Sequence, residues 1–250
     1  MSDILLLQAA VALLAFFCAG IVKGTLGVGL PLVALPITAT VMPPAQAMAL
    51  TIGPILVSNL WQVIEAGILR TAVQRFGTLL LGLSVGIVIG GALLSWVDVR
   101  TSLLLLLGTV LLGFCVAQVL PTRWRIQRRD ERWLSPLAGL ASGFVGGLTG
   151  LYGTIILSYL IALRLDKDTF VGTISLLYLV GIIVLSATLA GHRLLTVTEL
   201  IGTVLVLLPT FAGMLLGRRL RQRISQPLFR QLLLLLLTVI GSSLIWRGWH

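Results

Sequence analysis

Charged residues are scarce in this chain of 250 residues. Only 10% of the residues are Asp, Glu, Lys or Arg, and acidic residues are fewer than basic ones, 8 against 18. A soluble domain carries about a quarter charged residues. Apolar runs of about 20 residues, the length that spans a bilayer, recur along the sequence instead. The composition therefore predicts an all-α polytopic membrane protein.

Residues that usually carry chemistry are also few. The two cysteines, Cys18 and Cys115, lie in apolar stretches and suit neither a disulfide framework nor a metal site. No Asp lies in the middle of a predicted span, and neither does His192 or His250. The sequence holds no HExxH, GxSxG, Walker A or CxxC pattern. We therefore expect no enzyme activity, no metal and no cofactor.

Six apolar stretches are each about long enough to cross about 30 Å of hydrocarbon at 1.5 Å per residue. They are residues 45–65, 76–96, 101–120, 169–190, 198–216 and 228–246. Two further stretches do not fit one crossing. Residues 4–42 are too long and are broken at 23–29. Residues 134–163 are broken at 146–153 into two pieces of about 14 residues, each only about 21 Å long as helix.

The basic residues predict the topology. One arginine cluster precedes the second broken stretch, and another follows the span 198–216. They are Arg123, Arg125, Arg128, Arg129 and Arg132, and Arg218, Arg219, Arg221 and Arg223. Both loops should be cytoplasmic. Because two full spans lie between them, residues 134–163 must return to their own side, as a re-entrant hairpin or a double crossing. The short pieces favour the hairpin. Of the 18 basic residues, 14 then lie inside, three outside and Lys23 in the membrane.

This topology divides the chain into two repeats, residues 1–122 and 134–250, joined by a cytoplasmic arginine-rich linker at 123–133. Each repeat is a broken, re-entrant hairpin followed by three transmembrane helices. Since three is odd, the second repeat starts from the opposite face, and the repeats are inverted. Glycines match at offsets of 123 to 125: Gly20 with Gly143, Gly24 with Gly147, Gly27 with Gly150, Gly67 with Gly191, and Gly77-Thr78 with Gly202-Thr203. Broken helices at matching positions of two halves point to a transport site.

Lys23 is the only charged residue between Ile4 and Ala49. It could snorkel to an interface. Alternatively, the tip of the hairpin lies near the midplane, where a charged side chain costs at least about 3 kcal/mol. No carboxylate lies nearby in sequence to neutralise it. On the second interpretation, a transported anion supplies the opposite charge.

The two glycine clusters are expected to form the tips of the hairpins. Their members are Gly24, Gly27 and Gly29, and Gly146, Gly147, Gly150 and Gly153. Glycine permits unwound backbone and close approach, although helix packing alone is an alternative explanation. The second arm of each hairpin should begin near Gly29 or Gly153, where its free N–H groups favour an anion. Thr25, Thr149, Tyr152 and Thr154 are candidate hydroxyl donors.

The span after the first hairpin has a polar face. Thr51, Ser58, Gln62 and Glu65 are spaced to share one side of a helix, and Asn59 lies next to Ser58. Pro54 should kink this span. Asn59 and Gln62 are the candidates for substrate binding, whereas Glu65 is expected at the interface. In the matching span of the second half, Ser175 and Tyr178 are polar candidates, and core packing explains them equally well.

The segment AGIVKGTLGVGLPLVALP, residues 19–36, resembles the first repeat signature of the TauE/SafE sulfite exporter family. Gly24, Gly27, Gly29 and Pro36 stand at its positions. GFVGGLTGLYG, residues 143–153, resembles the second signature. The chain departs from the family at Leu30 and Pro31, where many members have glycine, and at Thr154, where proline is frequent. The resemblance implies a bacterial inner-membrane transporter that exports sulfite or small organosulfonates.

We therefore expect a secondary transporter that exports a small anion of the sulfite or organosulfonate class, by alternating access at two tips near the midplane. An anion channel with the tips as its constriction is one alternative, and a non-transporting membrane scaffold is another. The expected partners are the anion, membrane lipid and a second copy of the chain in a homodimer. Nucleic acid is not expected, because the net charge of +10 fits cytoplasmic loops that face anionic lipid.

Overall fold

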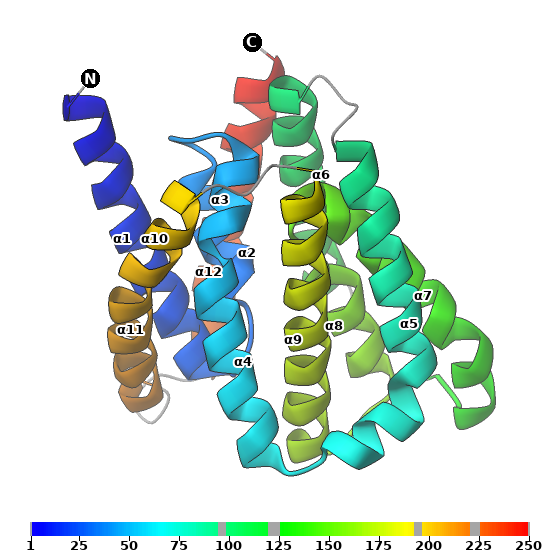
Figure 1. Ribbon diagram of the computed structural model, residues 1–250. Helices are drawn as coiled ribbons and strands as arrows, with labels where there is room; N and C mark the ends of the chain where they lie inside the picture. The colour runs from blue at the N-terminus through cyan, green and yellow to red at the C-terminus, as the bar shows by residue number, and fades with distance from the viewer. Residues whose placement is uncertain (1, 95–98, 120–125, 193–196, 221–225, 250) are drawn as a thin grey trace. The chain divides into compact units, whose positions relative to one another are not determined.

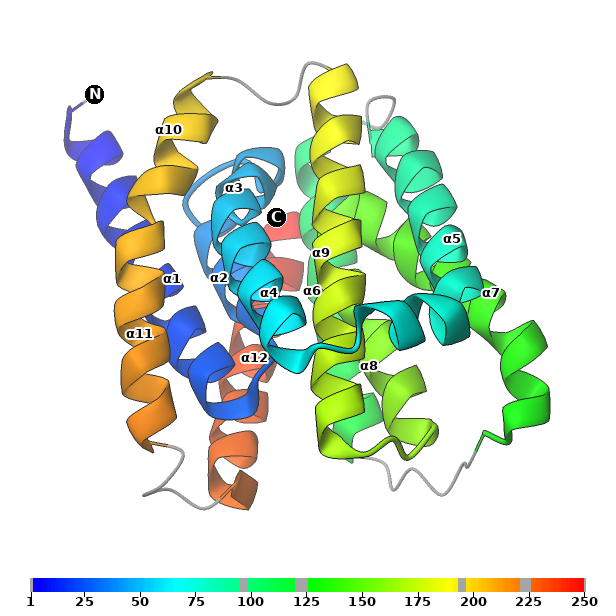
Figure 2. The same ribbon diagram turned by 60° about the horizontal axis from the view of Figure 1, so that its bottom comes forward.

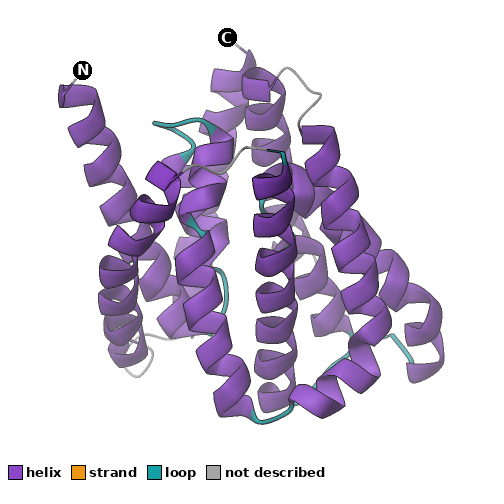
Figure 3. Cartoon of the chain, viewed as in Figure 1, coloured by secondary structure: helices purple, strands orange, loops and turns teal. Residues whose placement is uncertain are grey.

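The computed structural model describes residues 2–94, 99–119, 126–192, 197–220 and 226–249, and these residues form helices and short loops with no strand (Figure 3). Among them, seven helical stretches are long and apolar enough to cross a membrane. They are Ile4–Leu26, Pro44–Ala66, Leu69–Leu94, Ser102–Val119, Asp168–Gly191, Ile201–Leu220 and Gln231–Trp249. The protein is therefore an all-α, multi-pass membrane protein, as the composition predicts.

The six predicted spans all appear as helix. They correspond to α3 and α4 (Pro44–Leu50 and Ile52–Ala66), α5 (Leu69–Leu94), α6 (Val99–Val119), α9 (Lys167–Gly191), α10 and α11 (Val197–Leu205 and Leu207–Leu220), and α12 (Gln226–Trp249). The start predicted for α5 is wrong. Residues Leu69 to Arg75 were expected in a loop but are helical. They meet the apolar helix at a kink at Phe76 (φ −107°, ψ 16°), the residue predicted as its start.

Proline divides two of these spans. Each break, at Thr51 and at Val206, falls three residues before a proline, Pro54 or Pro209. Proline has no N–H to donate to the carbonyl four residues earlier, so the helix is interrupted there. At the first break that carbonyl belongs to Leu50, and it accepts a 2.9 Å hydrogen bond from the hydroxyl of Thr203 on α10. The sequence predicts the kink at Pro54 but not the hydrogen bond from Thr203 to the carbonyl of Leu50.

The two broken stretches form hairpins with unequal arms. The first consists of α1 (Ser2–Leu26) and α2 (Leu30–Thr38), and the second of α7 (Arg128–Thr149) and α8 (Gly153–Ala162). The prediction of two similar short arms at 134–163 is wrong, because α7 extends back through residues assigned to the arginine-rich linker and has 22 residues, whereas α8 has 10. The first turn of α7 tolerates this polar sequence because Asp130 and Glu131 suit a helix N-terminus. Arg123, Arg125, Arg193, Arg221 and Arg223 lie outside the described residues.

Hydrogen bonds confirm that each hairpin brings its two ends together. The amide of Gln8, near the start of α1, donates to the carbonyl of Val41 beyond α2 at 2.8 Å. In the second hairpin, the hydroxyls of Ser135 and Tyr159 lie 2.6 Å apart. The backbone N–H of Ile126 also donates to the carbonyl of Ala162 at 3.2 Å. The chain therefore reverses direction at both breaks.

The helices pack into two compact units that each combine both halves of the sequence. Unit 1 holds α1, α2, α3, α10, α11, α12 and most of α6, and unit 2 holds α5, α7, α8, α9 and most of α4. Figures 1 and 2 show α1 beside α11 and α5 beside α7. Each hairpin thus packs on a helix from the other half of the chain.

Glycines set these two helix pairs in the same way. In unit 1, a Cβ on Gly20 or Gly24 would overlap the backbone of α11, and one on Gly213 or Gly217 would overlap α1. In unit 2, Gly143 and Gly147 have the same relation to α5, and Gly86 and Gly90 to α7. The hairpin glycines match at an offset of 123, and their partners at 127. Such spacing by four lets two membrane helices approach to backbone contact.

Candidate functional site

The first tip, residues 23–29, ends α1 with a glycine cap. Gly27 has φ 83°, and its N–H donates to the carbonyl of Lys23 at 2.7 Å. This left-handed conformation is one that glycine adopts without steric cost and that terminates helices. Gly29, with φ 99°, then precedes α2, which starts at Leu30 as predicted.

The second tip, residues 146–153, repeats this geometry. Gly150 has φ 75°, and its N–H donates to the carbonyl of Gly146 at 2.7 Å. Tyr152 then precedes α8, which starts at Gly153. The capping glycine, the carbonyl it bonds and the residue before the second helix all lie 123 residues after their counterparts in the first tip. The position that corresponds to Lys23 is therefore Gly146.

Lys23 lies inside unit 1 with only 3% of its surface exposed. Its neighbour Gly24 packs against the backbone of Met214 on α11, so Gly24 has a packing role. The hydroxyl of Thr25 donates to the carbonyl of Ile21 at 2.8 Å and reaches that of Gly217 at 3.1 Å. The hydroxyl proton of Thr25 thus lies between one carbonyl of α1 and one of α11, and Thr25 links the two helices. The first tip therefore combines a buried lysine with a firmly held backbone.

The threonines of the second tip also bond to backbone. Thr149 donates to the carbonyl of Val145 at 2.7 Å and accepts the N–H of Leu151 at 3.2 Å. Thr154 donates to the carbonyl of Leu151 at 3.0 Å. Gly147 packs against α5. These side chains fix the shape of the tip before α8 begins.

Tyr152 and Tyr178 form the interior of the second tip. Their ring centroids lie 5.3 Å apart, and the hydroxyl of Tyr152 donates to the carbonyl of Tyr178 at 3.1 Å. Tyr152 is fully buried and takes the space that a side chain on Gly146 would need. The hydroxyl of Tyr178 similarly fills the position of a side chain on Gly153. Lys23 and Gly29 of the first tip thus correspond to Gly146 and Tyr152 of the second tip.

In a comparison with protein-family models, residues 12–244 match the family "Sulfite exporter TauE/SafE". The chain belongs to the TauE/SafE family. Comparisons with curated proteins and with solved structures give no match. Membership makes this protein one of a family of membrane transporters rather than enzymes.

The geometry explains the glycines of the TauE/SafE signature positions. Gly24 permits contact between α1 and α11, Gly27 caps α1, and Gly29 gives the backbone its second left-handed turn before α2. Pro36 lies inside α2. Neither α2 nor α8 has a side-chain N-cap, so the first-turn N–H groups of both helices lack a capping side chain. Pro31 loses little near the start of α2, where an N–H would have no helical partner.

The polar residues of α4 are placed in unit 2. Asn59 is buried, and its amide donates to the carbonyl of Ile55 in its own helix at 2.7 Å. Gln62 accepts a hydrogen bond from Ser175 on α9 at 3.1 Å, which joins the two spans. Glu65 is exposed, as expected for an interfacial residue. The structure brings Gln62 and Ser175 together, a pairing that the sequence does not predict.

Three residues of unit 2 were not predicted for this region. Ser142 donates to the carbonyl of Tyr152, and Gly181 leaves room for the ring of Tyr152. Thr173 on α9 is buried, and its hydroxyl has no hydrogen-bond partner among the described residues. Ser142 lies ten residues before Tyr152, and small residues are frequent in membrane helices. Their spacing alone carried no signal for a site.

Proposed function

We propose that this protein is a secondary transporter that exports a small anion, of the sulfite or short organosulfonate class, across the bacterial inner membrane. The observation that carries the proposal is the repeated tip: the same glycine-capped break, 123 residues apart, each followed by a short helix without a side-chain N-cap. Membership of a family of sulfite exporters supports the class of substrate.

The electrostatics of the tips favour an anion. Each short helix presents an N-terminus worth about half a positive charge, and Lys23 adds a full charge where it is protonated. A charged lysine buried in a membrane span is costly, and bound anionic substrate reduces that cost. A compact monoanion or dianion suits each tip better than a cation or a large neutral solute does.

The hydrogen bonds of the tips favour modest selectivity. The hydroxyls of Thr25, Thr149 and Thr154 are used by neighbouring carbonyls. At the first tip, recognition therefore rests on backbone N–H groups and Lys23. In unit 2 it rests on the backbone N–H groups of the second tip, with Asn59, Gln62 and Tyr178 as further candidates. Backbone donors bind any small oxyanion of suitable size, so several trigonal or tetrahedral oxyanions should compete.

The proposed mechanism is alternating access between two inverted repeats, residues 1–122 and 134–250, with re-entrant hairpins. The matching tips and the matching glycine contacts of α1 with α11 and of α7 with α5 support a repeat. In each hairpin a long arm is followed by a short one, of 25 and 9 residues in the first. A helix of 9 residues is only about 14 Å long and does not span the hydrocarbon.

Flux in proteoliposomes tests the proposal. Purified protein should carry sulfite and short sulfonates, and other small oxyanions such as sulfate should compete with them. A secondary transporter gives flux that saturates and shows counterflow, whereas a channel shows neither in the same range of concentration. Absence of flux for every anion, in protein that remains folded, would favour a scaffold and overturn the proposal.

A further inference from the structure

A polar cavity of about 570 Å³ lies in unit 2, away from the glycine tips. Its charged walls are Arg75 on α5, Arg128 and Glu131 in the first turns of α7, and Arg164 and Asp166 in the turn between α8 and α9. We call it the arginine cavity. Three guanidinium groups and two carboxylates thus surround one space.

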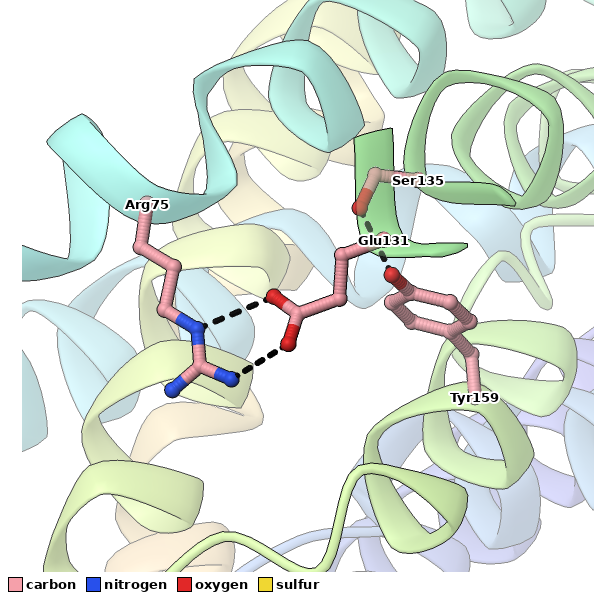
Figure 4. A network of polar contacts seen from close by, with 4 residues as sticks. All are labelled: Arg75, Glu131, Ser135 and Tyr159. Carbon is pink, nitrogen blue, oxygen red and sulfur yellow. Dashed lines mark hydrogen bonds and ion pairs between the residues drawn. The ribbon is translucent and has the colours of Figure 1, made fainter. Parts of the chain in front are cut away.

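Both carboxylates are used to build the walls. Glu131 accepts two hydrogen bonds from Arg75, from Nε at 3.0 Å and from Nη2 at 2.7 Å (Figure 4). Such a two-point pair fixes both side chains. Asp166 caps α9 by accepting the N–H of Thr169 at 2.9 Å, and this bond lowers the pKa of its carboxyl group. Among the described residues, neither carboxylate forms an ion pair with Arg128 or Arg164.

A second polar contact lies next to this pair, between residues that do not themselves line the cavity. The hydroxyls of Ser135 and Tyr159 lie 2.6 Å apart next to Glu131, and they join α7 to α8 (Figure 4). The backbone hydrogen bond between Ile126 and Ala162 joins the segment just before α7 to the end of α8. These hydrogen bonds hold together α7, which carries Arg128, and α8, which Arg164 follows.

Arg128 and Arg164 complete the cavity without a carboxylate of their own. The one ion pair in the described part of the chain is that of Arg75 with Glu131. Arg164 has φ 50° and is the one non-glycine residue with positive φ among the described residues. It follows the end of α8, at a position where glycine is preferred. A strained arginine in place of glycine points to a role for its side chain.

We propose that the arginine cavity is a second anion site, in which Arg128 and Arg164 bind a phosphate- or sulfate-type oxyanion. Planar guanidinium groups match the oxygens of such groups in pairs. The shared chemistry is a tetrahedral oxyanion, either free in solution or as the headgroup phosphate of an anionic lipid. The site is independent of the tips and of Lys23.

Thermal stability of the purified full chain in detergent tests the site. Inorganic phosphate and sulfate should raise the melting temperature above that in chloride at equal ionic strength. Arg164→Gly removes the charge and suits the backbone, so the variant should fold and lose at least about tenfold in apparent affinity, or about 1.4 kcal/mol. Arg128→Gln should act likewise. Arg129→Gln, in the same turn of α7 but outside the cavity, should bind as the parent protein does.

A second arm identifies the source of the anion. If phosphate and sulfate fail, nanodiscs of phosphatidylglycerol should stabilise the parent protein more than nanodiscs of phosphatidylcholine, with the same loss in Arg164→Gly. That result supports a lipid headgroup site. The proposal is overturned if neither source stabilises the protein, or if Arg129→Gln weakens binding as much as Arg128→Gln does. It is also overturned if Lys23→Ala abolishes the effect, because the anion then binds at the tip.

Discussion

Gly153 and Tyr178 are complementary: the hydroxyl of Tyr178 on α9 lies where a side chain on Gly153, at the start of α8, would be. The tyrosine ring also stacks at an angle of 51° against Tyr152, whose own space depends on Gly146 and Gly181. The second tip is therefore shaped by tyrosines that fill the positions left by glycines. Side-chain packing and backbone geometry are coupled there.

This relation predicts the outcome of Gly153→Ala. The added methyl overlaps the Tyr178 hydroxyl, and overpacking of this kind costs about 1–3 kcal/mol. Thermal stability and transport should both fall. Tyr178→Phe removes the hydroxyl, so the double variant should recover part of the loss in a double-mutant cycle. Gly113→Ala, in α6 with nothing near its Cβ, is the control and should be neutral. If the losses of stability of Gly153→Ala and Tyr178→Phe simply add in the double variant, the contact between Gly153 and the Tyr178 hydroxyl is contradicted.

Lys23 should be required for transport. Lys23→Ala removes the charge from the first tip, and we expect anion flux to fall at least about tenfold while the protein still expresses and melts normally. Lys23→Arg keeps a charge of different shape and should retain part of the activity. Flux assays with radiolabelled sulfite would measure both. Normal flux in Lys23→Ala would show that the lysine is a snorkelling residue.

The glycine caps should matter at both tips. Gly27→Ala and Gly150→Ala place a side chain in a left-handed conformation, which costs about 1 kcal/mol and disturbs the N–H groups that follow. Each should impair transport. Gly67→Ala is a matched control, because Gly67 also has positive φ (63°) but lies in open space outside the tips. Its variant should lose similar stability and keep its flux. Equal flux in Gly27→Ala, Gly150→Ala and Gly67→Ala would show that the conformation of the tips does not affect transport.

Thr203 should stabilise the break before Pro54. Its hydroxyl donates to the carbonyl of Leu50 at 2.9 Å and lies 2.8 Å from the N–H of Gly53. Thr203→Val leaves both groups without a partner, which costs about 1–3 kcal/mol per buried group. A lower melting temperature is expected, and Thr203→Ser should retain the parent value. Thr109→Val, at an exposed threonine that bonds only within its own helix, is the control. An unchanged melting temperature in Thr203→Val would count against this role.

The topology can be measured with single cysteines placed after Cys18 and Cys115 are replaced. Cysteines at 70, 128 and 221 should all label from the cytoplasmic side, because the predicted topology places 14 of the 18 basic residues inside. Residue 221 lies outside the described residues. A cysteine at 247, in α12, should label from the periplasmic side. Opposite labelling of 128 and 221 would rule out inverted repeats.

The sequence determined much of the fold. Apolar runs located six spans, because each polar side chain that faces hydrocarbon is unfavourable. A span must therefore be a continuous stretch of mainly apolar residues, which is visible in the sequence. The glycine clusters located both tips and the starts of α2 and α8, because a left-handed helix cap is a local preference of the backbone. The starts of α5 and α7 were predicted less well. Charge marks the end of an apolar run, whereas a helix continues through polar residues while its backbone bonds are satisfied.

Only the tertiary structure decided which surfaces meet. The glycines of α1 and α7 show that another backbone can approach, but not that it belongs to α11 or α5. The place of Tyr152 over Gly146 and the pairing of Arg75 with Glu131 likewise join residues distant in sequence. Which helix packs on α1 or α7 depends on the fit between two whole helix faces, and the sequence of one segment does not specify that fit. The sequence therefore specified the spans and the breaks, and packing specified how those breaks are held and where the arginine cavity forms.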